Sequence, residues 1–209
     1  MYIDMLVLDR LDGSAGHAVA AYPVRKTEVV LGRSTSLEEV HADRCRADRV
    51  PVLRRAGGGG VVVLSPGMVV ISVAGASGIP FCLREHMNLV NRRIMAALAV
   101  LGVEGLSLRG ISDIALGDRK LAGSSLYRRR DLVLYQGALL VSPDLGLIDR
   151  YLKHPRTEPD YRRGRPHADF LTSLRDEGYL LTPGEAAADI RKVLEEANPW
   201  QREAVHELR

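Results

Sequence analysis

The sequence has few cysteines, few aromatic residues and no long apolar run, and each shortage excludes a class of protein. Its two cysteines, Cys45 and Cys82, cannot form a disulfide framework. Aromatic residues make up 5% of the chain, which is few for a surface that stacks nucleic-acid bases. No apolar run approaches the ~18–20 residues of a membrane helix, and Asp4 and Asp9 lie where a signal peptide would be basic and then apolar. We therefore expect a soluble, cytoplasmic protein that binds neither a membrane nor nucleic acid.

An excess of one charge is also missing, because 29 Lys and Arg residues accompany 26 Asp and Glu residues. Two short basic clusters, at residues 128–130 and 161–165, are predicted to be solvated turns. Hydrophobic residues make up 46% of the 209 residues, which is enough for a full core. No linker or repeat divides the chain, so we expect a single domain over residues 1–209.

Runs of Val, Ile and Leu predict β-strands, mostly in the first two thirds of the chain. We expect strands at residues 2–8, 28–31, 50–53, 61–64, 68–73, 111–116 and 131–141. The last run is almost continuously apolar, which is typical of a central strand. Ser65-Pro66-Gly67 is expected to form the turn between the fourth and fifth strands.

Helices are predicted at residues 37–48, 83–101, 144–152 and 167–175, with a final helix that begins after Thr182 and stops before Asn198. Thr182 as N-cap, Pro183 and Glu185 are typical of a helix start. The buried stripe of the 83–101 helix is predicted to comprise Leu83, Met87, Val90, Ile94, Leu98 and Leu101, with Gly102 turning left-handed after it. The pattern favours an α+β fold with a mixed β-sheet flanked by helices.

A run of four glycines follows Arg54 and Arg55 and leads directly into a strand. Four consecutive glycines are costly to order, which favours a loop whose backbone approaches a ligand closely. Its amide N–H groups could bind an anion, and the two arginines could bind phosphate or carboxylate through paired hydrogen bonds. The alternative is a flexible hairpin. No Gly-Lys-Ser/Thr sequence closes the loop, so it is not a Walker A motif.

Two further segments combine polar and small residues with β-rich runs. Lys120 follows the Gly117-Asp118 turn, and the small residues at 122–125 leave room for a ligand beside a lysine that would otherwise be solvated. Gln136 and Gly137 interrupt an apolar strand, which indicates either a ligand contact or a β-bulge.

In this order, the three segments resemble the lipoate–protein ligase family of the biotin/lipoate ligase superfamily. That family has an Arg-Arg-x-x-Gly-Gly-Gly-x-Val loop, here residues 54–62, and an Asn-Asp or similar pair, here Ser112-Asp113. An Arg-Lys-x-x-Gly-Ser motif follows, here residues 119–124, and then a His-Gly-x-Leu-Leu strand, here residues 136–140. The resemblance extends over residues 29–174.

The resemblance implies an enzyme that joins lipoate to AMP, using ATP and Mg²⁺, and releases pyrophosphate. The lipoyl group then passes to a lysine of an acceptor, a lipoyl carrier domain or a glycine-cleavage H-like protein. Lys120 would be the catalytic residue, bridging the carboxylate and the α-phosphate, and no residue is assigned to a metal. The residues that would bind the substrates are Arg54, Arg55, Gly58, Gly59, Gly60, Val61, Val62, Ser112, Asp113, Gly123, Ser124, Gln136, Gly137 and Ala138.

The chain departs from the family pattern at two positions of the site. Leu64-Ser65 replace a His-Asp pair, and Gln136 replaces the histidine of the strand motif, keeping hydrogen bonding but losing titration. About 35 residues remain after Leu174, too few for the family's accessory C-terminal domain, so the resemblance implies a single ligase-like catalytic domain over residues 1–209. Short members of this kind resemble the catalytic half of bipartite ligases, which makes a separate accessory chain a candidate partner.

Two other functions stay open. An octanoyl or lipoyl amidotransferase of the same superfamily needs no ATP, because a cysteine thiolate takes the acyl group first. Here no cysteine lies shortly before the lysine motif or after the glutamine strand. A non-catalytic binder of lipoate or of a lipoylated protein would fit the missing His-Asp pair, although a pure binder has less need of Lys120.

Overall fold

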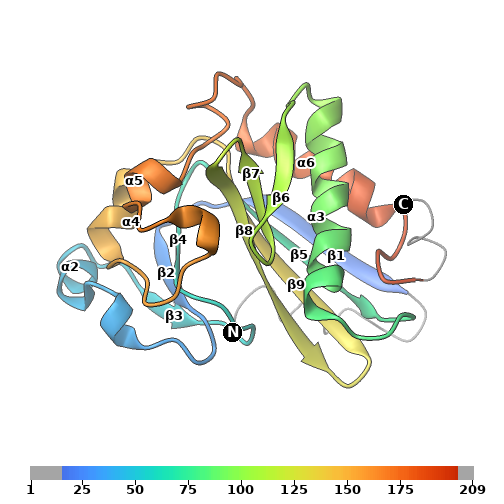
Figure 1. Ribbon diagram of the computed structural model, residues 1–209, viewed down its shortest axis with the longest axis horizontal. Coiled ribbons are helices and arrows are strands. Elements are labelled where there is room, and N and C mark those ends of the chain that lie inside the picture. The colour runs from blue at the N-terminus through green and yellow to red at the C-terminus, as the bar shows by residue number, and fades with distance from the viewer. Residues whose placement is uncertain (1–15, 202–209) are drawn as a thin grey trace.

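The computed structural model describes residues 16–201, which form two β-sheets with helices packed around them (Figure 1). Within that range the larger sheet has six strands in the order β1-β5-β9-β8-β7-β6, and all neighbours are antiparallel. The smaller sheet has the order β3-β2-β4, with β2 parallel to β3 and antiparallel to β4. The strands are β1 (His17–Pro23), β2 (Glu28–Leu31), β3 (Val52–Arg54), β4 (Val62–Leu64), β5 (Met68–Ala76), β6 (Leu106–Arg109), β7 (Asp113–Leu116), β8 (Arg119–Arg129) and β9 (Leu132–Leu140).

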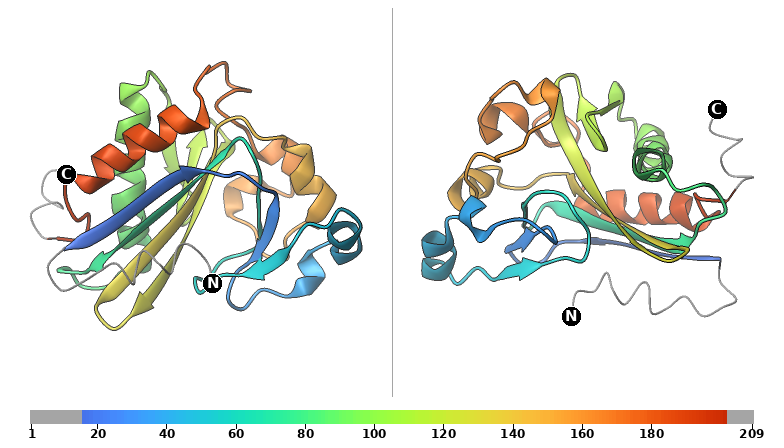
Figure 2. Two further views of the ribbon diagram at one scale, coloured as in Figure 1. Left: turned by 180° about the vertical axis from the view of Figure 1, so that it is seen from behind. Right: turned by 60° about the horizontal axis from the view of Figure 1, so that its bottom comes forward.

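Two long helices, α3 (Leu83–Val100) and α6 (Pro183–Glu195), pack on one face of the larger sheet (Figure 2). Shorter helices accompany the smaller sheet (Figure 1). They are η1 (Leu37–Glu39), α2 (Ala42–Ala47), α4 (Gly146–Tyr151), η2 (Asp160–Arg162) and α5 (His167–Phe170). The predicted α+β fold with a β-sheet flanked by helices is confirmed; mixed pairing occurs in the smaller sheet, and the larger sheet is antiparallel throughout.

Successive side chains of β5 point to opposite faces of the sheet, so the strand contributes to two different cores. Val69, Ile71 and Val73 pack into the cluster that contains α3 and α6. Met68 and Val70 point the other way, into the second core cluster with the smaller sheet and α4. The helices therefore bury one face of the larger sheet, while part of the other face packs against the smaller sheet.

Several predicted elements are confirmed. β2 covers the predicted residues, β9 is an interior strand, and α3 ends one residue before its predicted end, with Gly102 at a φ of 84°. At the start of α6, Glu185 N donates to Thr182 Oγ1 at 3.2 Å and Thr182 N donates to Glu185 Oε2 at 2.9 Å. Both halves of the capping box are present, so local sequence alone determined this helix start.

Other predictions were wrong in detail. The 37–48 helix is split into η1 and α2, and the 167–175 helix ends at Phe170. It ends because Leu171 pairs with Lys120 of β8 and Thr172 N donates to Lys120 O at 3.0 Å, which requires extended backbone. Leu83, placed in the buried stripe of α3, is 46% exposed because it is the first residue of the helix and precedes the turns that contact the sheet.

Strands β1, β6 and β8 were not among the predicted strands. β1 is rich in alanine, a poor strand former, and is extended because it pairs with β5 along its whole length. The predicted strand at residues 2–8 lies outside the described residues. No helix between residues 16 and 201 is long and apolar enough to cross a bilayer.

Candidate active site

A cavity of about 290 Å³ lies between the two sheets and the segment that carries α4, η2 and α5. The smaller sheet lines it from β2 and β4, and the larger sheet lines it from β5, β8 and β9, on the face opposite α3 and α6. The buried apolar part of the lining includes Met68, Val70, Leu140, Ile148, Leu152, Phe170 and Leu171. The predicted site residues that line the cavity are Arg55, Gly59, Gly60, Val61, Val62, Lys120, Gly123, Ser124, Gln136, Gly137 and Ala138. The four that do not are Arg54, Gly58, Ser112 and Asp113.

The Lys120 side chain is held at the cavity wall by an ion pair. Its Nζ lies 2.8 Å from Oδ1 of Asp113, and 28% of the side chain is exposed. Asp113 also accepts a hydrogen bond at 2.9 Å from the hydroxyl of Tyr161, which lies in η2. Burial and the Asp113 carboxylate raise the pKa of Tyr161, so this phenol stays a donor at neutral pH. Asp113 thus acts on the cavity through Lys120 rather than by lining it.

A β-bulge in β8 explains the direction of the lysine. Ile114 pairs with Ala122 and Ala115 with Lys120, so Leu121 is an extra residue on β8. Residues three apart on a regular strand point to opposite faces. Here, however, a Cβ on Gly123 would meet Lys120 Cε and Nζ at 2.7 Å, so the lysine side chain lies across the glycine. The bulge and Gly123 together aim Lys120 along the strand.

The two arginines organise the glycine-rich loop. Arg55 Nη2 donates to the carbonyl oxygens of Gly58 at 2.6 Å and Gly60 at 3.0 Å, and its Nη1 donates to Val30 O at 3.3 Å. Gly59 has a φ of 85°, a left-handed conformation that favours glycine. The loop is therefore an ordered wall of the cavity rather than a flexible hairpin.

Arg54 orders the neighbouring turn instead of facing the cavity. Its Nη1 donates to the carbonyl oxygens of Gly32, Arg33 and Thr35 at 2.7 to 3.0 Å. These contacts place the 32–35 turn beside the glycine-rich loop, where Thr35 Oγ1 donates to Gly59 O at 2.7 Å. A direct contact between Arg54 and a substrate remains a prediction.

The Gln136–Gly137 interruption of β9 is not a bulge. Gln136 pairs in regular register with Ser72 of β5 and Ser125 of β8, and Gly137 pairs with Ile71 and Ser124. Both residues line the cavity. Of the two explanations for this sequence, the β-bulge is excluded and the ligand contact stays a prediction.

Ser112 supports the lysine region from behind. Ser112 O accepts from Asn91 Nδ2 at 3.0 Å and from Ser124 Oγ at 3.1 Å. Asn91 Oδ1 in turn accepts from the buried hydroxyl of Tyr135 at 2.6 Å. This network connects α3 and β9 to the start of β7, so it fixes the backbone that carries Asp113.

The segment at residues 153–171 closes one side of the cavity and was not predicted to be part of the site. Lys153, Pro155, Thr157, Pro159, Arg162 and His167 line the cavity from this segment. Arg165 fixes it to the turn before Lys120, donating to Asp118 O at 2.7 Å and lying 3.0 Å from Asp118 Oδ2. These contacts join residues far apart in the sequence, so no local pattern predicts them. The basic cluster at residues 161–165 was the only sequence feature that pointed to this segment.

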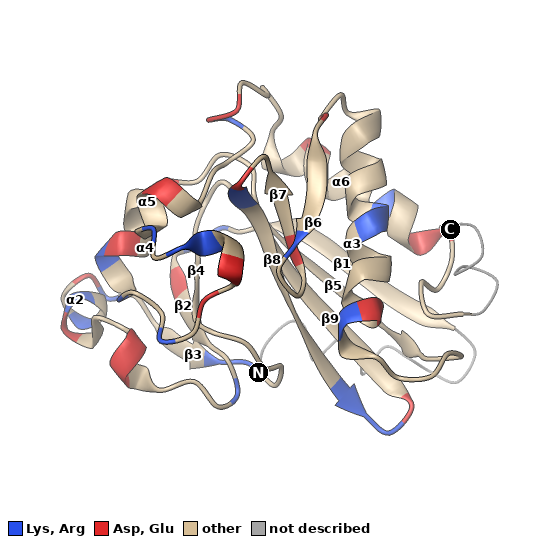
Figure 3. Cartoon of the chain, viewed as in Figure 1, with Lys and Arg blue, Asp and Glu red and all other residues tan. Residues whose placement is uncertain are grey.

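The two basic clusters differ in solvent exposure. Residues 128–130 are exposed at the end of β8 and in its turn, as predicted, and Figure 3 shows them as a short basic stretch in a molecule whose charges are otherwise interspersed. The prediction for 161–165 was wrong at Arg162, whose side chain is 5% exposed. Its guanidinium packs 4.9 Å from the centre of the Phe170 ring, which removes it from solvent.

The charge lining the cavity is mainly positive. Arg55, Lys120, Lys153 and Arg162 line it, against the one carboxylate of Glu39 among the described residues. Such a lining suits an anionic ligand. No group of three or more His, Cys, Asp or Glu side chains that could hold a metal ion occurs within residues 16–201.

Comparison with known proteins identifies the family of this chain. The pattern of the family described as the lipoyl protein ligase A/B catalytic domain matches residues 2–195. A protein of Aeropyrum pernix, named as a provisional lipoate-protein ligase A, is 34% identical over 145 residues, which are 67% of this chain and 53% of that protein. The chain thus spans about half the length of this relative.

Solved structures share the fold at low sequence identity. A crystal structure of lipoate-protein ligase A bound with ATP matches with a TM-score of 0.76 and 19% identity, over 97% of this chain and 78% of that one. A bipartite lipoate protein ligase from Thermoplasma acidophilum, described together with its E2 lipoyl domain, matches with a TM-score of 0.74 and 19% identity, over 91% of this chain and 71% of that one. At this identity the likeness establishes the fold alone.

Proposed function

Because this chain belongs to the lipoyl protein ligase A/B catalytic-domain family, we propose that it activates lipoate with ATP and transfers the lipoyl group to a lysine of a carrier domain. The observation that carries the proposal is Lys120, with its Nζ fixed by Asp113 at 2.8 Å on the wall of a mainly basic cavity. A carboxylate and an α-phosphate can react only where their mutual repulsion is offset, and a fixed cation does this without reorganising during the reaction.

In the proposed first step, the lipoate carboxylate attacks the α-phosphorus of ATP, forming lipoyl-AMP and releasing pyrophosphate. Lys120 Nζ has two donors left besides the one directed at Asp113, enough to contact both the carboxylate and the α-phosphate. The ordered wall at Gly59–Val61 would cover the reacting groups and exclude water, and the apolar lining from Val62, Met68 and Val70 would hold the acyl chain.

In the second step, the carrier lysine amine attacks the acyl carbon of lipoyl-AMP, an amide forms and AMP leaves with the electron pair of the broken bond. The acceptor is expected to be a lipoyl domain or a glycine-cleavage H-like protein. The T. acidophilum ligase is bipartite, which supports testing this chain with and without an accessory chain.

Mg²⁺ would enter this site bound to the nucleotide. Within the described part of the chain, the nearest carboxylate to Lys120 is already bonded by the lysine and by Tyr161. The residues present therefore suit an ion held mainly by phosphate oxygens and water, as Mg²⁺ commonly is, and its chemistry would be to neutralise phosphate charge.

An ATP-independent amidotransferase is disfavoured by the position of the thiols. Cys45 is buried in α2 and Cys82 is exposed just before α3, and neither lines the cavity. Burial, followed by the charge of Asp48, raises the pKa of Cys45, which makes it a poor nucleophile. The site offers no thiolate to carry an acyl group.

The test is acid-dependent pyrophosphate release with ATP and Mg²⁺, using lipoate, octanoate and biotin in parallel. We expect release with lipoate, and a loss of about 10²–10³-fold or more in Lys120→Ala. Lys192→Ala, on the exposed side of α6, is the matched control and should retain full activity. Equal rates in wild type and Lys120→Ala would reject Lys120 as the catalytic residue.

Failure to release pyrophosphate with any acid, with or without an accessory chain, would reject the ligase proposal. Measurable lipoate binding under those conditions would then favour the non-catalytic binder. Turnover from an octanoyl carrier protein without ATP would favour the amidotransferase instead.

A further inference from the structure

Arg162 is a buried cation with an unused donor on the cavity wall. Its side chain is 5% exposed and lines the cavity, and its Nε donates to Arg165 O at 2.9 Å. Its Nη2 is buried and has no hydrogen-bond partner among residues 16–201. Native proteins leave few buried donors unsatisfied, because each forfeits the hydrogen bonds that water would supply.

The surrounding carboxylate does not satisfy this guanidinium. Glu158 Oε2 lies 3.4 Å from Arg162 Nε. The same carboxylate accepts from Gly164 N at 2.7 Å and lies 3.0 Å from His154 Nε2. Three donors thus share this carboxylate, and Arg162 Nη2 still has no hydrogen-bond partner among the described residues.

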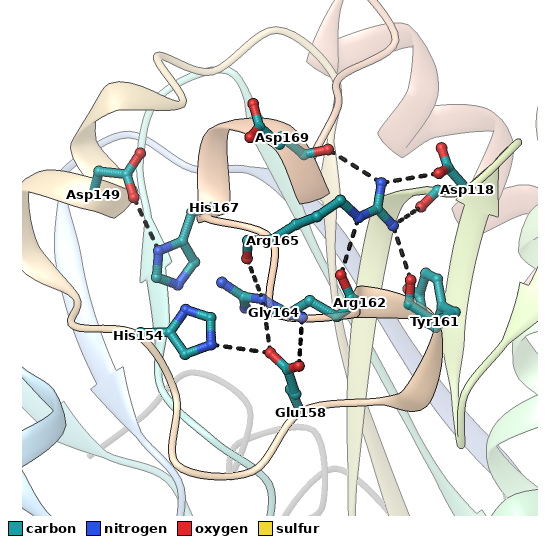
Figure 4. A network of polar contacts seen from close by, with 10 residues as sticks. All are labelled: Asp118, Asp149, His154, Glu158, Tyr161, Arg162, Gly164, Arg165, His167 and Asp169. Carbon is teal, nitrogen blue, oxygen red and sulfur yellow. Dashed lines mark hydrogen bonds and ion pairs between the residues drawn. The ribbon is translucent and has the colours of Figure 1, made fainter.

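Two imidazoles flank the unused donor. Figure 4 shows the Arg162 guanidinium extending toward the rings of His154 and His167. His167 Nδ1 lies 3.0 Å from Asp149 Oδ1, which fixes the ring. Burial and the Arg162 charge lower the pKa of His167, so at neutral pH the fixed positive charge on this part of the wall belongs to Arg162.

We infer that Arg162 is a substrate-binding residue whose Nη2 donates to an oxyanion of the bound substrate. The inference deepens the proposed function and rests on it for the identity of the substrate. A guanidinium suits phosphate and carboxylate oxygens, and a bound oxyanion would satisfy the one buried donor that the protein leaves unsatisfied here. Lys120 on β8 and Arg162 on η2 both line the cavity, so a ligand with negative charge at two points, such as a nucleoside triphosphate, would match both cations.

The oxyanion has two available sources, the phosphoryl groups of ATP and the carboxylate of the acid. Isothermal titration calorimetry separates them with three probes: inorganic pyrophosphate, ATP without acid, and octanoate without ATP. The variants are Arg162→Gln, which removes the charge, and Arg162→Lys, which keeps the charge but not the paired donors. Arg163→Asn is the matched control: it removes one positive charge from the adjacent exposed position, whose φ of 53° asparagine tolerates.

We expect Arg162→Gln to weaken pyrophosphate and ATP binding by about 10- to 100-fold, with Arg162→Lys intermediate and Arg163→Asn unchanged. Octanoate binding should be retained, which also shows that each variant is folded. A loss confined to octanoate would instead identify the carboxylate as the oxyanion. Wild-type affinity for all three probes in both Arg162 variants would overturn the inference.

The two proposals can fail separately. The wild-type protein could form no acyl-adenylate while Arg162→Gln binds pyrophosphate more weakly than wild type. In that case the proposed function fails and the oxyanion site stands. If the wild type forms acyl-adenylate and the Arg162 variants bind every probe normally, the oxyanion site alone fails. Should Arg162→Gln not fold, as judged by thermal unfolding, Arg162→Lys supplies the same comparison.

Discussion

The side chain of Lys120 lies across Gly123, close enough that a Cβ atom on the glycine would stand 2.7 Å from both Cε and Nζ of the lysine. The atoms in conflict belong to the far end of a flexible side chain and not to the backbone. A larger residue at position 123 would therefore push the lysine aside without disturbing the strand. The absence of a side chain at position 123 is part of how the site places its cation.

Gly123→Ala is expected to fold normally and to lose activity. The added methyl group displaces Lys120 Nζ from Asp113 by a fraction of an ångström or more, and misplacement on that scale can cost about 10²-fold in rate. Steady-state pyrophosphate release and urea unfolding measure the two effects. Gly184→Ala adds the same methyl group in α6, where its only contact within 4 Å is Thr182 Oγ1 at 3.9 Å, and should keep full activity. Wild-type turnover by Gly123→Ala would contradict the role assigned to Gly123.

Tyr161→Phe tests the support behind the ion pair. The hydroxyl donates to Asp113 Oδ2 at 2.9 Å, while the ring packs 5.0 Å from Phe170 and is preserved by the substitution. Loss of a hydrogen bond to a charged group is expected to lower the free energy of unfolding by about 1.5–3 kcal/mol. We expect a smaller loss of pyrophosphate release than in Lys120→Ala, since the lysine itself remains. Unchanged stability and rate would show that the hydroxyl does not support Asp113.

Asn91→Ala should be among the more destabilising single substitutions near the site. It removes the partner of the buried Tyr135 hydroxyl, at about 1–3 kcal/mol, and one of the two hydrogen bonds to the Ser112 carbonyl, which keeps the bond from Ser124. Tyr135→Phe removes only one of these bonds and should cost less. Because the two residues share a hydrogen bond, the double variant should lose less than the sum of the single losses in urea unfolding. Additive losses would show that the two side chains do not couple.

The Asp48–Arg150 ion pair predicts a specific loss of stability in acid. Hydrogen bonds from Arg150, and then from Tyr151, lower the pKa of Asp48 from 3.8 to about 2. The folded state therefore favours the ionised carboxylate, and this contribution is complete above pH 3.8 and is lost as the pH falls toward 2. Asp48→Asn should be less stable than wild type near pH 5, with the difference shrinking as the pH falls through this window.

Urea unfolding at several pH values measures this difference, and Asp131→Asn, at an exposed turn position, controls for the change of net charge. A gap between wild type and Asp48→Asn that stays constant down to pH 2 would show that Asp48 is not preferentially ionised in the folded protein.

Local sequence was sufficient for elements whose causes are local. The α6 start follows from a capping box, and the α3 stripe follows from its helical period. β1 and the early end of α5 could not be predicted, because both depend on pairing with residues far away, Val69–Gly75 for β1 and Lys120 for Leu171. Short alanine-rich or polar segments adopt whichever conformation such a partner offers.

The site residues likewise include some that local sequence predicts and some that it does not. Motifs on continuous segments, the glycine loop and the lysine and glutamine strands, could be found in the sequence, and most of their residues line one cavity. Tyr161 and Arg162 could not be predicted as site residues. Tyr161 belongs to the site because it donates to Asp113, and Arg162 because it is buried against Phe170. Basic residues in a turn are usually solvated, and only tertiary packing shows that Arg162 is not.

The most direct test of the central claim is to detect the acyl-adenylate itself. The protein is incubated with ATP, Mg²⁺ and lipoate without an acceptor, with any accessory chain it requires, and the quenched products are examined by mass spectrometry. We predict lipoyl-AMP with wild type and with Lys192→Ala, and none above background with Lys120→Ala. Lipoyl-AMP formed equally well by Lys120→Ala, or by no variant under any condition, would contradict the account.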